Sequence, residues 1–379
     1  MTVQCRFPVL LASLVDLRSR LCISSGSLFS KIVRGSVRGA FRMKSFALWC
    51  DARNANDSAR IRVLMNFNLW VESEKKKSKT FLDVGVMLLP SAADSMEQES
   101  VGDVVKSISF YCPFLLEKKD FEDLFSKMDE KTVGAIFNDR CECTKPDSRP
   151  VNLITLHNGD PCRRFLLCKC EPETKIVQFI KSDSGKGTII KILIDSNVEA
   201  LPVYYRFRLS GDFISSLVAV SHSKDKLLTS AFAQEEVIDF RFNDYRTLDD
   251  DRVSENIDEK AQGCVPIEGM AVHFLLMSLA TVDVDSGCPG GKGRRLLEKD
   301  IWNNYAPCED ELDDVAAWHW SKQLKRASDG YKVDLRLRRH ICNWKTIMLY
   351  IFWLFVIDFV FNLIENPFFN WLGSLFPRS

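Results

Sequence analysis

The chain has 379 residues, of which 46% are hydrophobic, and this length and composition are those of a globular protein with one large or two ordinary domains. Its 51 basic residues balance its 51 acidic residues, so the overall charge gives no support for a nucleic-acid partner. The 13 cysteines are odd in number and irregularly spaced, which indicates a reducing compartment rather than a secreted, disulfide-stapled protein.

Residues 1–42 form a basic leader. The first 50 residues contain eight basic residues and a single acidic one, Asp16. An arginine- and serine-rich segment that is poor in acids is typical of an organellar transit peptide, and a basic arm on a membrane surface has the same composition. Met43 also offers an alternative translation start, in which case residues 1–42 are not part of the protein. The sequence leaves these alternatives open.

Residues 43–245 are predicted to form a β-rich domain. "ARIRVLMNFNLWV" and "KTFLDVGVMLL" flank a charged turn and predict a hairpin, and "KIVQFIKS" followed by "GTIIKILID" predicts a second one. The many short strands favour a mainly antiparallel sheet in an α+β fold. Between them, residues 117–139 place Phe121, Leu124, Phe125 and Met128 on one stripe, which predicts an amphipathic helix.

Residues 246–335 are predicted to be a mixed, partly helical segment. Acids cluster over residues 244–259, which indicates a solvated connector. The stretch "EDELDDVAAWHWSKQLKRA", residues 309–327, begins with acids and ends with bases. This charge order matches a helix macrodipole and predicts a helix.

Residues 336–379 are predicted to attach the chain to a lipid bilayer. Residues 346–364 carry one formal charge, and 19 residues are close to the roughly 20 that a membrane-spanning helix needs. The tail after this single transmembrane helix is predicted to lie in the membrane interface. By the positive-inside rule, the N-terminal bulk of the chain is cytoplasmic. The basic residues expected to contact anionic headgroups are Arg336, Arg338, Arg339 and Lys345.

A polar stripe interrupts the apolar segment. Asp358, Asn362 and Glu365 are spaced i, i+4 and i+7, which places them on one helix face. In one interpretation, several copies pack with these stripes inward and the protein is a homo-oligomer. In the other, the span ends earlier and the three residues mark the exit from the membrane.

No catalytic or cofactor motif of high specificity is present, and no cofactor is predicted. The glycine-rich stretch "GCPGGKGRR" lacks the P-loop spacing, but Lys292, Arg294 and Arg295 on a flexible loop are candidates for binding an anion. The histidines show no H-x-x-x-H or H-E-x-x-H spacing, and His319, between two tryptophans, is predicted to pack rather than to bind a metal. The weak zinc candidates are Cys141, Cys143, Cys168 and Cys170, whose C-x-C spacing is also explained by packing on strands.

Two functions fit these observations. The favoured one is a membrane-anchored cytoplasmic sensor, effector or scaffold that binds an unknown protein or small molecule, self-associates through its helix and perturbs the membrane. The alternative is a membrane-tethered hydrolase whose catalytic residues are dispersed along the sequence. The absence of a recognisable motif favours the non-enzymatic interpretation.

Overall fold

A computed structural model describes residues 44–375, with internal gaps at 55–59, 72–79, 91–99, 147–150, 160–161, 197–199, 222–232, 259–260, 287–290, 308–311, 313 and 341–343. The predicted basic leader, residues 1–42, lies outside the described residues.

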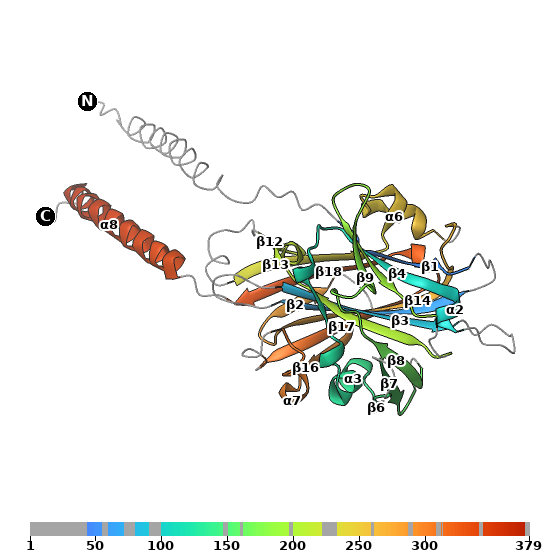
Figure 1. Ribbon diagram of the computed structural model, residues 1–379. Coiled ribbons are helices and arrows are strands. Elements are labelled where there is room, and N and C mark those ends of the chain that lie inside the picture. Colours follow the sequence, from blue (N-terminus) through green and yellow to red (C-terminus); the bar gives the residue numbers. More distant parts are fainter. Residues whose placement is uncertain are drawn as a thin grey trace. The chain divides into compact units, whose positions relative to one another are not determined.

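The described strands form three sheets (Figure 1). The first has the order β1-β4-β10-β9, with β1 at Ala47–Ala52, β4 at Val105–Cys112, β9 at Val177–Lys181 and β10 at Thr188–Leu193. The second has the order β12-β13-β18-β15, with β12 at Val218–Ser221, β13 at Ala233–Phe242, β15 at Asp283–Ser286 and β18 at Tyr331–His340.

The third and largest sheet carries the candidate site. Its order is β16-β17-β14-β2-β3-β11-β8-β7-β6, with the short β5 also paired to β11. Its strands are β2 (Ile61–Val71), β3 (Thr80–Pro90), β5 (Phe121–Asp123), β6 (Cys141–Thr144), β7 (Val151–Leu156), β8 (Arg164–Cys168), β11 (Val203–Leu209), β14 (Ile267–Leu279), β16 (Gly291–Leu296) and β17 (Val315–Leu324).

The molecule is sheet-rich and mainly antiparallel, as the strand patterns predict. Strands β2 and β3 pair antiparallel along their whole length, and β9 pairs antiparallel with β10, so both predicted hairpins are confirmed. Two pairs in the large sheet are parallel, β14 with β2 and β11 with β8.

The two faces of the large sheet bury different clusters. On β2, Val63 and Phe67 belong to the main core, which also contains Phe110 of β4 and Phe240 of β13. The intervening residues of β2 point to the opposite face, as a strand period of two requires. Helices α3 (Glu130–Phe137) and α7 (Lys299–Trp302) pack on that outer face, and side chains of β7 and β8 from the same sheet contribute to its cluster. Both helices lie on the opposite side of β2, β3 and β14 from β1 and β4 (Figure 1).

Other helices are short and connect strands. They are α2 (Val101–Val104), α4 (Asp212–Ser215), α6 (Asp251–Asn256) and the 3-10 turns η1 (Lys118–Asp120), η2 (Phe125–Lys127), η3 (Tyr245–Thr247) and η5 (Ala327–Asp329). The predicted solvated connector therefore contains structure: Asp250 is buried and caps α6 by accepting a hydrogen bond from the Val253 amide at 3.2 Å.

Two helix predictions are wrong in part or entirely. Residues 117–139 form a helix only from Glu130, where the Asp129 side chain accepts from the Thr132 amide at 2.8 Å. Upstream, Phe121 is buried and pairs with Leu209 on β11, so tertiary pairing overrides the helical pattern. The predicted helix at 309–327 is instead strand β17, held between β14 and β16.

The predicted transmembrane helix at 346–364 is also wrong. Helix α8 (Trp344–Leu375) has 32 residues, but among the described residues no helix is both long and apolar enough to cross a membrane. The single-pass assignment is corrected accordingly.

Candidate functional site

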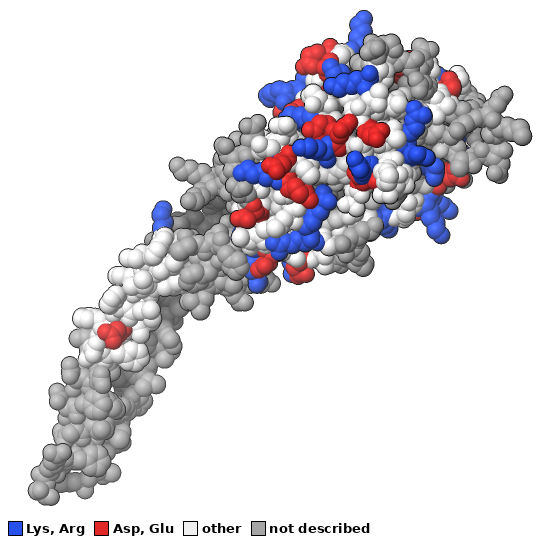
Figure 2. All heavy atoms as spheres, turned by 90° about the horizontal axis from the view of Figure 1, so that it is seen from below, with Lys and Arg blue, Asp and Glu red and all other residues white. Residues whose placement is uncertain are grey.

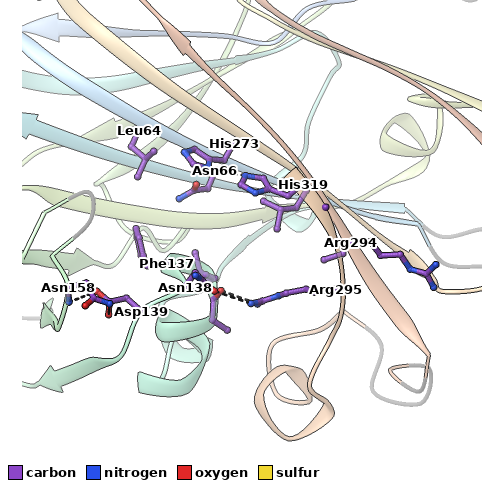
Figure 3. A pocket seen from close by; sticks show the side chains of 15 residues that line it. Leu64, Asn66, Phe137, Asn138, Asp139, Asn158, His273, Arg294, Arg295 and His319 are labelled. Carbon is purple, nitrogen blue, oxygen red and sulfur yellow. Dashed lines mark hydrogen bonds between the residues drawn. The ribbon is translucent and has the colours of Figure 1, made fainter. Parts of the chain in front are cut away.

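A pocket of about 590 Å³ lies on the outer face of the large sheet, and we call it the histidine pocket. This volume falls within the range of small-molecule sites. Its floor comes from neighbouring strands: Leu64 and Asn66 from β2, His273 and Leu275 from β14, and Ala317 and His319 from β17 (Figure 3). The other described lining residues are Ala135, Ile136, Phe137, Asn138, Asp139, Asn158, Gly293, Arg294 and Arg295.

His273 and His319 form a close pair in this floor. Leu275 is in register with His319 across the antiparallel β14–β17 pair, so the two histidines are diagonal neighbours on one face. Their ring centroids are 5.1 Å apart and their planes differ by 17°, so the two rings lie nearly coplanar, edge to edge. His273 Nδ1 and His319 Nε2 are 3.0 Å apart, which is hydrogen-bond distance. One of these nitrogens must donate and the other must accept.

The two adjacent arginines of β16 point to opposite faces. Arg295 is in register with Ala317, a floor residue, and donates to the Ala135 carbonyl at 3.2 Å. Arg294 is in register with Trp318, and its guanidinium lies 5.4 Å from the centre of that indole ring. Figure 3 shows Arg295 directed toward Asn138 and Arg294 directed away from the histidines. The predicted anion-binding loop is therefore partly strand, and Lys292 lies in β16 with its side chain outside the described residues.

The end of α3 forms the wall opposite the histidines. Asn138 closes the helix in the left-handed conformation, with φ of 52°, which turns the chain so that Phe137 and Asp139 both line the pocket. The Asp139 carboxylate accepts hydrogen bonds from the amides of Arg140, Asn158 and Gly159 and from the Asn158 side chain. Its charge is therefore engaged by the surrounding loop.

A buried charge cluster lies beside the floor, on the same face of the large sheet. Asp83 accepts from Arg208 Nε at 2.6 Å and from the Tyr305 hydroxyl at 2.8 Å. Arg206, which is fully buried, donates to the hydroxyls of Tyr204 and Tyr305. Asn66 reaches the same Tyr204 hydroxyl at 3.4 Å, so the pocket floor is connected to Arg206 through one tyrosine.

This cluster contains two guanidinium groups, Arg206 and Arg208, and two carboxylates, Asp83 and Glu122. Burial by itself raises the pKa of Asp83, but attraction to Arg208, the hydrogen bonds from it and attraction to Arg206 lower that pKa below its ordinary value. Burial lowers the pKa of Arg206, whereas attraction to the Tyr204 and Tyr305 oxygens raises it, and the net shift is upward. The two buried guanidinium groups share the buried Asp83 carboxylate, and the half-exposed Glu122 carboxylate lies 3.8 Å from Arg208 Nη1, so the formal charges of the cluster balance.

The zinc candidates do not come together. Cys141 and Cys143 pack against the cluster on the outer face, whereas Cys168 and Cys170 belong to the main core. Burial raises the pKa of the Cys168 thiol to about 12, and burial followed by the Glu130 charge raises that of Cys141 to about 11. Both are thiols near neutral pH. Within the described part of the chain, no three histidine, cysteine or acidic side chains are grouped to hold a metal.

The basic residues before α8 are mostly engaged within the second sheet. On β18, Arg338 pairs with Glu235 at 3.0 Å, and Arg339 pairs with Glu236 at 2.9 Å in a buried setting. Arg336 lies on the same strand, and Lys345 is an exposed residue of the first turn of α8. On the face shown in Figure 2, basic and acidic side chains are intermixed over the surface of the sheets.

The polar stripe of α8 is partly visible. Asn362 donates to Asp358 at 3.3 Å, so these two side chains lie next to each other on α8. Glu365 falls within α8, but its side chain lies outside the described residues. Self-association through this stripe and contact with lipid stay predictions.

Sequence reasoning missed the histidine pair. The two residues are 46 positions apart, and only the β14–β17 register brings them together. The alternation "WHW" carries a usable signal, because it places His319 on the opposite face from Trp318 and Trp320. Recognising β17 as a strand is the step that makes this signal readable.

No protein-family model and no curated protein matches the sequence. Among solved structures, the M1 zinc metallopeptidase from Deinococcus radiodurans aligns with 8% identity and a TM-score of 0.24, over 73% of this chain and 42% of that one. A two-domain M1 zinc metallopeptidase mutant bound to L-arginine gives 6% identity, a TM-score of 0.23, and coverage of 73% and 41%. The mutant bound to L-tryptophan has 8% identity and a TM-score of 0.24, over 76% of this chain and 43% of that one. The chain spans less than half the length of these proteins, and TM-scores this low carry no argument about fold or function.

Proposed function

We propose that the β-rich domain is a ligand-binding module whose histidine pocket takes a small organic anion with an apolar body. One observation carries the proposal: Arg295 and the His273–His319 pair line the same pocket. Positive groups that are already fixed by hydrogen bonds bind an anion without paying a large ordering cost. Apolar walls from Leu64, Phe137 and Leu275 suit a hydrocarbon body.

This proposal retains the ligand-sensing part of the sequence interpretation. It favours a binding module over a hydrolase, because the described lining of the histidine pocket contains no serine, threonine or cysteine to act as a nucleophile. The pocket lining also offers only one carboxylate, and that group is already engaged by four N–H donors.

Isothermal titration with benzenesulfonate, beside the neutral benzenesulfonamide, tests the proposal. The charged compound should bind the full chain more tightly than the neutral one. Arg295→Met removes a charged donor and should weaken benzenesulfonate binding by about 10- to 150-fold, since such a hydrogen bond contributes about 1.5–3 kcal/mol. Arg295→Lys, which keeps the charge, should recover part of the loss.

Arg338→Met is the control, because Arg338 lies on β18 of the second sheet, is exposed, and does not line the histidine pocket. It removes the same net charge and should change the affinity by less than about threefold, as expected for an exposed charge. If both variants lose the same amount of benzenesulfonate affinity, net charge alone explains the effect, and the proposal loses its basis.

A further inference from the structure

The two histidines of the pocket share one hydrogen bond, and only one of the two bonded nitrogens carries a proton. At 3.0 Å, His273 Nδ1 and His319 Nε2 cannot both be protonated without directing two N–H groups at each other. Thus the observed pair holds at most one imidazolium. A second proton would place two cations in contact, and the hydrogen bond would be lost.

We infer that the histidine pocket takes up a proton together with its anion, through the His273–His319 pair. This inference rests on the proposed anion site. An anion beside the pair favours its protonated form, since an opposite charge within a few ångströms stabilises imidazolium. By linkage, protonation must then tighten anion binding by the same factor.

Among the described residues, the register partner of His273 on β2 is Asn66 and its register partner on β17 is Ser321. The uncharged described residues across the pocket include Phe137, Asn138 and Asn158. The charged groups in the lining are Arg294, Arg295 and Asp139.

Anion affinity should increase as the pH falls, because the pair gains a proton through the histidine range and the anion then binds more tightly. As pH rises, the proton is lost and the dissociation constant increases by up to about tenfold per pH unit, which is the limit for one linked proton. A neutral ligand of the same shape shows no such slope.

The test is titration of the full chain with benzenesulfonate, which stays ionised throughout, between pH 5.5 and pH 8. At each pH, paired measurements in two buffers of different ionisation enthalpy count the protons taken up. The wild type should take up a proton fraction that peaks near pH 6.5, with the dissociation constant rising with pH. The double variant His273→Gln, His319→Gln should bind with a constant affinity, near the wild-type value at pH 8.

His157→Gln is the matched control, because His157 lines the neighbouring hollow beside α3 rather than the histidine pocket. It should keep the wild-type slope. Binding of the wild type without proton uptake overturns this inference and leaves the proposed function standing. A slope that persists in the double variant also overturns it. Absence of binding at every pH removes the anion site itself, and the inference with it.

Discussion

Gly85 lies where the pocket floor meets the buried charge cluster. It is in register with Asn66 on one side and with Arg206 on the other. A Cβ atom at this position would overlap the Tyr204 hydroxyl and come within 2.9 Å of Arg206 Nη1. Both side chains are fully buried, so neither can move aside cheaply. We therefore expect Gly85→Ala to break the connection between Asn66, Tyr204 and Arg206.

The expected cost can be assembled from three contributions. Overpacking a dense core costs about 1–3 kcal/mol. Losing a hydrogen bond to a charged group costs about 1.5–3 kcal/mol. The reduced freedom of the unfolded chain returns about 0.4–1 kcal/mol. The net loss in the free energy of unfolding is therefore about 2–5 kcal/mol, measured by urea denaturation with an unchanged slope.

Gly269→Ala is the control, because a Cβ atom at that glycine meets nothing within 4 Å. Its free energy of unfolding should stay within about 1 kcal/mol of wild type. Benzenesulfonate affinity, measured under conditions where each variant is folded, should fall for Gly85→Ala and remain unchanged for Gly269→Ala. If both substitutions lower the free energy of unfolding by the same amount, the packing around Tyr204 does not hold Asn66 and Arg206 together.

Further predictions concern the charge cluster and α8. Asp83→Asn leaves Arg206 and Arg208 buried without the Asp83 carboxylate, and it should lower the free energy of unfolding by about 3–5 kcal/mol. The control is Glu235→Gln, which removes an ion pair to a half-exposed arginine and should cost less than about 1 kcal/mol. The pKa of Asp83 is lower in the folded state than its ordinary value of 3.8 in the unfolded chain. The ionised carboxylate therefore adds to the free energy of unfolding above pH 3.8, and this stabilisation is lost as the pH falls through the pKa of the folded state. Acid titration should thus destabilise the wild type below about pH 4 more steeply than Asp83→Asn, and parallel curves would contradict this assignment. The predicted self-association is tested by sedimentation of the full chain in detergent, with the double variant Asp358→Leu, Asn362→Leu measured beside it. If the polar pair fixes the assembly, the wild type forms a defined oligomer and the double variant does not. Equal masses for the two proteins would count against this prediction.

The sequence supports the sheet content and some local pairings because these depend on short-range patterns. The β2–β3 hairpin follows from two alternating segments separated by a charged turn. In contrast, the charge order of residues 309–327 resembles a helix, but the alternation of Trp318, His319 and Trp320 and the pairing with β14 determine the strand. Propensity is a weak prior when tertiary pairing competes with it.

The candidate site was predictable in one of its two parts. Arg295 could be selected from a basic, glycine-rich segment, although the opposite orientation of Arg294 depends on that segment being a strand. The His273–His319 pair depends on a register between strands that are far apart in the sequence. The cluster around Asp83 and Arg206 likewise assembles residues from three separated elements, and no local pattern encodes it.

The most direct test of the central claim is a crystal structure of the protein with 4-bromobenzenesulfonate, whose bromine can be located by anomalous scattering. The account predicts the sulfonate within hydrogen-bond distance of Arg295 and of one histidine of the His273–His319 pair, with the bromine against Phe137 and Leu64. A sulfonate bound elsewhere, or a histidine pocket containing only water at saturating ligand, would contradict it.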